Sequence, residues 1–173
     1  MIPIDRLAAL DDSAWQAVYD EFFTRLRNFA YARCGDLGEA EDIASETMAG
    51  ALKGIGSYQD RGAPFGAWLF RIARNVTTDH LRRRGRRVET AQLPEDREAP
   101  FAGFSTLEDQ DELVRVLGLL TEEQQTVISL RFFADVSLEE AARSMNKSVD
   151  AVKGLQQRAL GSLRRHLESG ATA

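Results

Sequence analysis

The chain has 173 residues, of which 43% are hydrophobic, and a formal net charge of −5. This length suits one compact domain or two small ones, and the hydrophobic fraction suffices for globular cores and argues against wholesale disorder. The N-terminus has an early acid without a following apolar run, and no apolar stretch approaches the roughly 20 residues that span a bilayer. We therefore expect a cytoplasmic protein with no membrane partner.

The first part of the chain has helical periodicity. One face of a long helix is predicted from apolar residues at three- and four-residue steps, namely Trp15, Val18, Tyr19, Phe22, Leu26, Phe29 and Ala30. The lone cysteine, Cys34, has no His or Cys nearby, so we interpret it as a small buried apolar residue. Asp36, followed three residues later by Glu39, resembles a capping box and predicts the start of a second helix.

The second helix has an acidic outer face. At first sight its acids resemble a metal cluster; they are Glu39, Glu41, Asp42 and Glu46. They are better interpreted as the outer face of an amphipathic helix, which also suits a basic partner. We predict no metal site and no cofactor.

A third helix is predicted to begin at Pro64, because proline fits the first turn of a helix. Its apolar side carries Phe65, Leu69, Ile72 and Val76. A polar and basic face, centred roughly 140° away, carries Arg71, Arg74, Asn75, Thr78 and Arg82. One side of this helix is therefore predicted to be core and the other a charged surface.

Charge is distributed unevenly around the end of this helix. Residues 71–87 carry a net charge of +6, and residues 82–87 (RRRGRR) hold five arginines. We favour contacts with nucleic-acid phosphates; the alternative is stabilisation of a helix C-terminus, which needs fewer cations. Tyr58, in the preceding loop, is suited to stack on an unpaired base. Residues 88–105, with two prolines and many acids, are predicted to be a flexible linker.

Four further helices are predicted after the linker, because helix-capping signatures recur there. They are Ser105 with Glu108, Thr121 with Gln124, Ser137 with Glu140, and Ser148 alone.

The last two of these helices predict a helix-turn-helix. Asn146 in the turn tolerates a left-handed conformation, and Ala141 and Ala142 permit a close helix crossing. In such a unit the second helix enters the major groove. We expect the following residues to meet DNA: Ser148, Asp150, Ala151, Lys153, Gly154, Gln157 and Arg158. On spacing alone, an ordinary helical hairpin with a solvated charged face remains an alternative.

The sequence carries no signal for catalysis. Its two histidines, His80 and His166, lie near arginines, which is a poor setting for a metal ligand, and no phosphate loop or nucleophile elbow occurs. We predict no catalytic residues and no enzyme.

Residues 40–48 (AEDIASETM) and 65–75 (FGAWLFRIARN), with Asp79 and Arg82, resemble domain two of the bacterial extracytoplasmic-function (ECF, group four) sigma factors. Residues 120–165 resemble their domain four. The resemblance implies an all-α fold of two small helical domains joined by a flexible linker. It places domain two at 1–87, the linker at 88–105 and domain four at 106–173.

The resemblance also implies partners. A sigma factor directs core RNA polymerase to promoter DNA and helps to open it, and an anti-sigma factor is expected to control it. The second helix would dock on the clamp helices of the largest polymerase subunit through Asp42, Ser45, Glu46 and Ala49. The unwound minus-ten element would be held by Tyr58, Arg61, Arg71, Arg74, Asn75, Thr78, Arg82 and Arg83. Domain four would bind the minus-thirty-five duplex and rest on the flap of the second-largest subunit.

Two groups of residues depart from the family pattern. Ser45 and Met48 stand where Gln and Phe are common, so the affinity for core polymerase is expected to differ. Residues 150–155 (DAVKGL) replace the common Gly-Thr-Val-Lys-Ser-Arg, so Asp150, Gly154 and Leu155 are expected to mark an altered minus-thirty-five preference.

Two other functions are compatible with parts of the pattern. A helical sensor fused to a helix-turn-helix would bind operator DNA as a dimer, and it would bind a palindrome tightly without polymerase. A small helical enzyme is disfavoured because the sequence offers no site for it.

Overall fold

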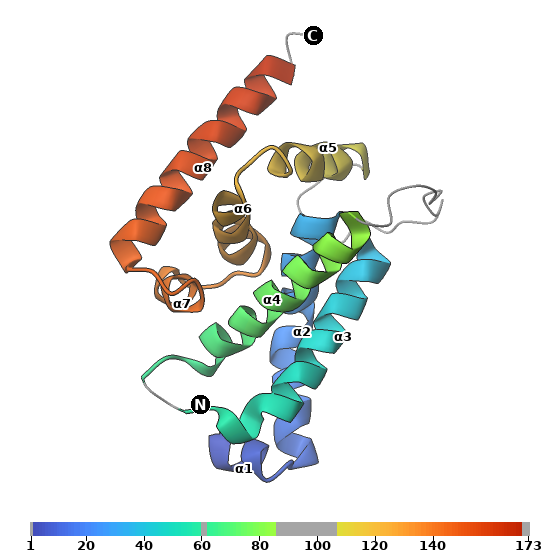
Figure 1. Ribbon diagram of the computed structural model, residues 1–173, viewed down its shortest axis with the longest axis vertical. Helices are drawn as coiled ribbons and strands as arrows, with labels where there is room; N and C mark the ends of the chain where they lie inside the picture. The colour runs from blue at the N-terminus through green and yellow to red at the C-terminus, as the bar shows by residue number, and fades with distance from the viewer. Residues whose placement is uncertain (1, 60–61, 86–106, 171–173) are drawn as a thin grey trace.

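The computed structural model describes residues 2–59, 62–85 and 107–170, and in these ranges the regular elements are helices (Figure 1). The N-terminal half consists of α1 (Ile4–Ala8), α2 (Asp12–Cys34), α3 (Leu37–Gly54), the 3-10 turn η1 (Ile55–Ser57) and α4 (Phe65–Gly85). The C-terminal half consists of α5 (Leu107–Leu117), α6 (Glu122–Ile128), the π-helical turn η2 (Ser129–Phe133), α7 (Leu138–Ser144) and α8 (Val149–Gly170). The predicted linker 88–105, including the expected cap at Ser105, lies outside the described residues.

Local signals fix the ends of α2. The Asp11 carboxylate accepts a hydrogen bond from the Ala14 amide, and bonds from Ser13, Ala14 and Arg6 lower the pKa of Asp11 to about 2. The helix ends at Gly35, whose φ of 70° is left-handed. A Cβ at Gly35 would lie 2.8 Å from the Val114 side chain, so glycine also permits the close approach of α5.

The predicted starts of α3, α6 and α7 are confirmed. Asp36 accepts from the Glu39 amide, as expected, while the Glu39 carboxylate lies 3.2 Å from the Arg84 guanidinium of α4. At Thr121 and Ser137 both bonds of a capping box are present. The first helix, α1, and the π-helical turn after α6 were not predicted.

The long helix α2 lies at the centre of the fold. It packs against α3 and α4 of the N-terminal half and against η2, α5 and α6 of the C-terminal half. Leu26 and Phe29 are fully buried, and the Phe29 ring meets Phe70 of α4 edge-on at 6.0 Å. The prediction that Tyr19 belongs to the buried face is wrong. Tyr19 lies at the edge of the apolar stripe, is 44% exposed and stacks on Phe23.

The two halves of the chain share one apolar core. Buried side chains of the N-terminal half, such as Leu26 and Phe70, belong to the same cluster as Leu130 and Val136 of the C-terminal half. Helix α4 packs against α7, and α2 packs against η2 (Figure 1). The sequence permitted compact and extended arrangements, and the structure is the compact one.

Cys34 is buried, as predicted, and its thiol donates to the Asp36 carbonyl at 3.3 Å. Burial raises the pKa of the thiol from 9.0 to about 12, because the thiolate is poorly solvated there.

We expect the folded protein to react far more slowly with a thiol reagent at about pH 8 than the urea-unfolded chain, since the thiolate is the nucleophile. Equal rates in an absorbance assay would contradict this burial.

The same pKa shift predicts a pH dependence of stability. The raised pKa favours the folded state below pH 9.0, and this contribution falls as pH rises toward 12, because only the unfolded thiol ionises in that window. The free energy of unfolding should therefore fall above about pH 9 in the wild type and fall less in Cys34→Ala. Chemical denaturation at several pH values measures the difference.

Candidate nucleic-acid interface

The polar face predicted for the third helix lies on the outer side of α4. Arg71, Asn75 and Arg82 are exposed, while Arg74 and Thr78 are half-buried. The Thr78 hydroxyl donates to the Arg74 carbonyl one turn earlier in the helix. The structure divides this face between two pockets, one at each end.

The first pocket, of about 400 Å³, lies where the loop before α4 meets the helix. It is lined by Ser57, Tyr58, Gln59, Ala63, Trp68 and Arg71. The Tyr58 ring packs on Trp68 at 5.0 Å, and its hydroxyl donates to the Ala63 carbonyl at 3.2 Å. Trp68 is half-buried and forms part of the wall. Aromatic walls beside a guanidinium suit a planar base.

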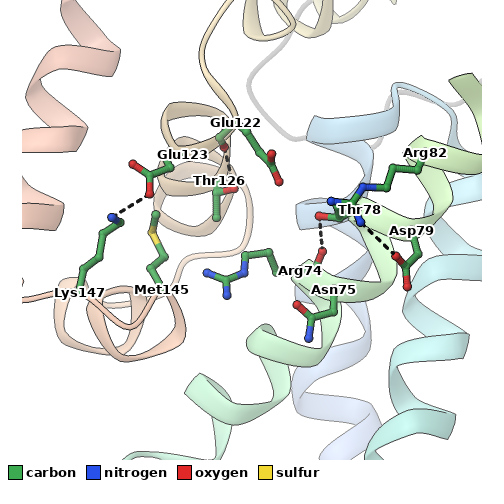
Figure 2. A pocket seen from close by; sticks show the side chains of 10 residues that line it. All are labelled: Arg74, Asn75, Thr78, Asp79, Arg82, Glu122, Glu123, Thr126, Met145 and Lys147. Atoms are coloured by element: carbon green, nitrogen blue, oxygen red, sulfur yellow. Dashed lines mark hydrogen bonds and ion pairs between the residues drawn. The ribbon is translucent and has the colours of Figure 1, made fainter.

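The second pocket, of about 590 Å³, is a cleft between the two halves of the chain (Figure 2). From α4 it is lined by Arg74, Asn75, Thr78, Asp79 and Arg82. From the C-terminal half it is lined by Glu122, Glu123, Thr126, Met145 and Lys147. In Figure 2 the Arg74 side chain extends from α4 toward α6 and α7. Four residues of the predicted minus-ten surface, namely Arg74, Asn75, Thr78 and Arg82, therefore share a cleft with Asp79 and with five residues of the C-terminal half that were not predicted to contact DNA.

The arginine run at the end of α4 has more than one role. Arg84 donates to the Cys34 carbonyl at 2.6 Å and pairs with Glu39. This arginine therefore stabilises the C-terminus of a helix, here α2, which is the alternative to a phosphate contact. Arg82 and Arg83 are exposed, with Asp79 4.0 Å from Arg82. Arg61 and the arginines at 86 and 87 lie outside the described residues.

The C-terminal half contains the predicted helix-turn-helix. Asn146 adopts a left-handed φ of 54°, and the Lys147 amide donates to the Ala142 carbonyl at 2.9 Å, which closes the turn after α7. The Ser148 hydroxyl then caps α8 by accepting from the Ala151 amide. Ala141 and Ala142 are buried at the crossing of the two helices.

Most residues predicted to meet duplex DNA lie together on the outer face of α8. Those exposed are Ser148, Asp150, Ala151, Lys153, Gln157 and Arg158, and Gly154 is half-buried among them. A Cβ at Gly154 would lie 3.3 Å from Arg158 Nη1, so the guanidinium lies back over the glycine. Leu155 is only 6% exposed and packs in the core, so the expectation that it marks promoter preference is wrong.

The four residues predicted to bind polymerase, namely Asp42, Ser45, Glu46 and Ala49, are all exposed on α3. The Glu46 carboxylate lies 2.7 Å from His80 Nε2 of α4. Beside them is an apolar groove of about 540 Å³ that sequence reasoning missed, lined by Leu10, Asp12, Trp15, Gln16, Tyr19, Met48, Ala49 and Leu52. In the sequence, this groove is indicated only by apolar residues at the edges of the apolar helix faces.

Among the described residues, no group of three or more His, Cys, Asp or Glu side chains is arranged to hold a metal ion. None of the described helices has the length and apolar character needed to span a membrane.

Comparisons with known proteins follow the same division into two halves. The family models "Sigma-70 region 2" and "Sigma-70, region 4" match residues 18–87 and 116–165. The chain is 35% identical to the ECF RNA polymerase sigma factor BldN of Streptomyces coelicolor, covering 97% of this chain and 66% of BldN. It is 29% identical to the ECF RNA polymerase sigma factor SigW of Bacillus subtilis, covering 91% of this chain and 90% of SigW.

Two solved structures have a similar fold. CnrH, in complex with the cytosolic domain of CnrY, matches with a TM-score of 0.74 and 24% identity over 96% of this chain and 95% of that chain. The sigma factor RpoE, in complex with the anti-sigma factor NepR from Bartonella quintana, matches with a TM-score of 0.68 and 24% identity. That match covers 88% of this chain and 96% of RpoE.

The left-handed turn predicts a specific effect of Asn146. Replacing Asn146 by Ala should lower the free energy of unfolding by about 1–2 kcal/mol, because a Cβ without a compensating polar group disfavours this conformation. Asn146→Gly should be neutral or slightly stabilising. Urea denaturation measures both, and equal losses in the two variants would contradict a conformational cause.

Proposed function

The chain belongs to the ECF sigma factors, and we propose that it directs core RNA polymerase to its own promoters and helps to open them. The observation that carries this proposal is that the two halves present surfaces suited to different forms of DNA, one to a single strand and the other to a duplex. An aromatic pocket beside a basic helix suits unpaired bases, and a helix-turn-helix suits duplex. The protein would act in the cytoplasm, where a bacterial promoter and polymerase meet.

The α4 surface is proposed to capture the melted minus-ten strand. An unpaired base would enter the pocket that Tyr58 and Trp68 line together, where stacking on an aromatic ring supports it and Arg71 lies beside it. The amide of Asn75 would read a second base edge, since an amide offers both donors and an acceptor. The cationic residues proposed for phosphate contacts are Arg61, Arg74, Arg82 and Arg83, with Thr78 as a hydroxyl donor.

The outer face of α8 is proposed to bind the minus-thirty-five duplex in the major groove. Arg158, Lys153 and Gln157 supply base- or phosphate-directed groups, and Ser148 and Ala151 lie at the helix start where phosphates dock. Asp150 and Gly154 are proposed to determine the difference from the common promoter. Asp150 places a carboxylate acceptor where the common sequence has Gly, and Gly154 lacks the common serine hydroxyl and leaves space for the Arg158 guanidinium.

Core polymerase is proposed to dock on the α3 face of Asp42, Ser45, Glu46 and Ala49. The neighbouring groove supplies the apolar surface that such an interface needs, with Leu10 58% and Leu52 45% exposed. The clamp helices of the largest subunit are the proposed partner here, and the flap of the second-largest subunit that of the C-terminal half. An anti-sigma factor that buried this groove would block assembly with polymerase.

Run-off transcription with purified core polymerase tests the proposal. We expect new transcript starts on genomic fragments only when the protein is added. The proposal fails if the protein neither binds core nor starts transcripts. Tight binding to a palindrome by the protein without polymerase would instead support a dimeric operator-binding regulator.

Two substitutions should distinguish the roles of the two proposed DNA surfaces. Arg158→Ala should weaken duplex minus-thirty-five recognition by about 1–3 kcal/mol, through loss of a base or phosphate contact. Asn75→Ala should leave duplex binding intact but slow strand opening. On a pre-melted template Asn75→Ala should recover more activity than Arg158→Ala, and equal effects there would contradict the division of labour.

A further inference from the structure

His80 of α4 lies between two carboxylates of α3, beside the face proposed to dock on polymerase. Its Nε2 lies 2.7 Å from Glu46 Oε2, and its Nδ1 lies 4.0 Å from Glu39 Oε1. The imidazole side chain is only 20% exposed, whereas the Glu46 side chain is 48% exposed. The ring thus connects a mostly covered position to a carboxylate that a partner protein can reach.

The short contact with Glu46 defines which nitrogen of the neutral ring carries the hydrogen. An ionised carboxylate can only accept hydrogen bonds, so Nε2 carries the hydrogen and donates to Glu46. A neutral imidazole has a single N–H, so Nδ1 then presents a lone pair toward Glu39. Protonation of the ring would replace this lone pair by a second N–H, which the Glu39 carboxylate favours.

Of the two carboxylates, Glu46 is the one whose charge depends more on the ring. Arg84 of α4 lies 3.2 Å from Glu39, so Glu39 already has a cation beside it. The Cys34 thiol at the end of α2, next to Arg84, stays neutral because burial raises its pKa to about 12. The charge state of His80 is therefore transmitted mainly to Glu46.

The remaining charged groups near the ring are exposed. Asp79, next to His80 in α4, lies 4.0 Å from Arg82, and Asp42 lies between the two carboxylates along α3. Both acids favour a protonated ring, while Arg83, one turn further along α4, opposes it. These groups sit in water, which screens them, so the direct contact with Glu46 dominates.

Protonation of the ring changes what Glu46 offers to a partner. Beside a neutral ring, Glu46 keeps its full negative charge and has lone pairs left for a second donor. Beside a charged ring, the same contact becomes a charge-assisted ion pair, and the negative charge of the α3 face falls by one. Because the acidic face of α3 suits a basic partner, a charged ring competes with that partner for Glu46.

We propose that His80 is a positioning residue for the polymerase-docking carboxylate Glu46, and that protonation of His80 weakens docking on core polymerase. This inference rests on the proposed function and adds a dependence on pH to it. Imidazole is the side chain that ordinarily changes charge between pH 5 and 8, so the dependence should be measurable near neutral pH.

Binding of the full chain, labelled at its N-terminus, to purified core polymerase tests the proposal. Fluorescence anisotropy should give an affinity about twofold to fivefold lower at about pH 6 than at about pH 8, which is the range for one charge pair at a protein surface. His80→Gln still donates to Glu46 but takes up no proton, so its affinity should lack this fall. His80→Arg places a permanent cation beside Glu46, so its affinity should be low at both pH values.

The matched control is His166→Gln, because His80 and His166 are the two histidines of the chain. His166 lies on α8, in the C-terminal half. The control should keep the full fall in affinity between the two pH values. Core polymerase contributes the same titrating groups to every measurement, so the difference between His80→Gln and the control isolates His80.

The outcomes distinguish this inference from the proposed function. The role of His80 is overturned if His80→Gln shows the same fall as the wild type, or if His80→Arg binds as tightly as His80→Gln at the higher pH. Circular dichroism identifies a variant that loses helix; if the His80 variants do so, Glu46→Gln decides, since removal of this charge should also abolish the fall. If the wild type binds core at neither pH, the sigma function itself is contradicted.

Discussion

The burial of α2 by both halves of the chain is the constraint on which the rest of the structure depends. Its apolar stripe is wide enough to pack on α3 and α4 and also to receive η2, α5 and α6. Each half alone would leave part of this stripe in water, which costs roughly 25 cal/mol for each square ångström of apolar surface. The shared core thus accounts for the compact arrangement, and the polar contacts determine its geometry.

Arginine is the residue that converts this apolar packing into a defined orientation. Arg25 and Arg33 are eight residues apart on α2 and therefore point to the same side of the helix. Each guanidinium group donates two hydrogen bonds to the C-terminal half. Arg25 also lies over the rings of Phe22 and Phe70, at 5.1 and 5.6 Å. The same residue type supplies the cations of the proposed nucleic-acid surface on α4, so the fold and the proposed function depend on the same chemistry.

The candidate site was predictable to the extent that it follows helix periodicity. The outer faces of α3, α4 and α8 carry the expected polar residues, because the apolar stripe of each helix decides which residues face water. The cleft between the halves was not predictable, since it joins Arg74 to Glu122 across 48 residues of sequence. The role of Arg84 was ambiguous for the same reason, as its partners lie on two other helices, Cys34 on α2 and Glu39 on α3.

The sequence by itself determined where α3, α6, α7 and α8 begin, because caps and turns are local. Thr121, Ser137 and Asn146 adopt the bonds and the left-handed φ that their side chains favour. Only the tertiary structure decided which edges of the stripes are covered: Leu155 is buried and Tyr19 is exposed, against expectation. Burial at the edge of a stripe depends on a distant helix, and neither periodicity nor capping contains that information.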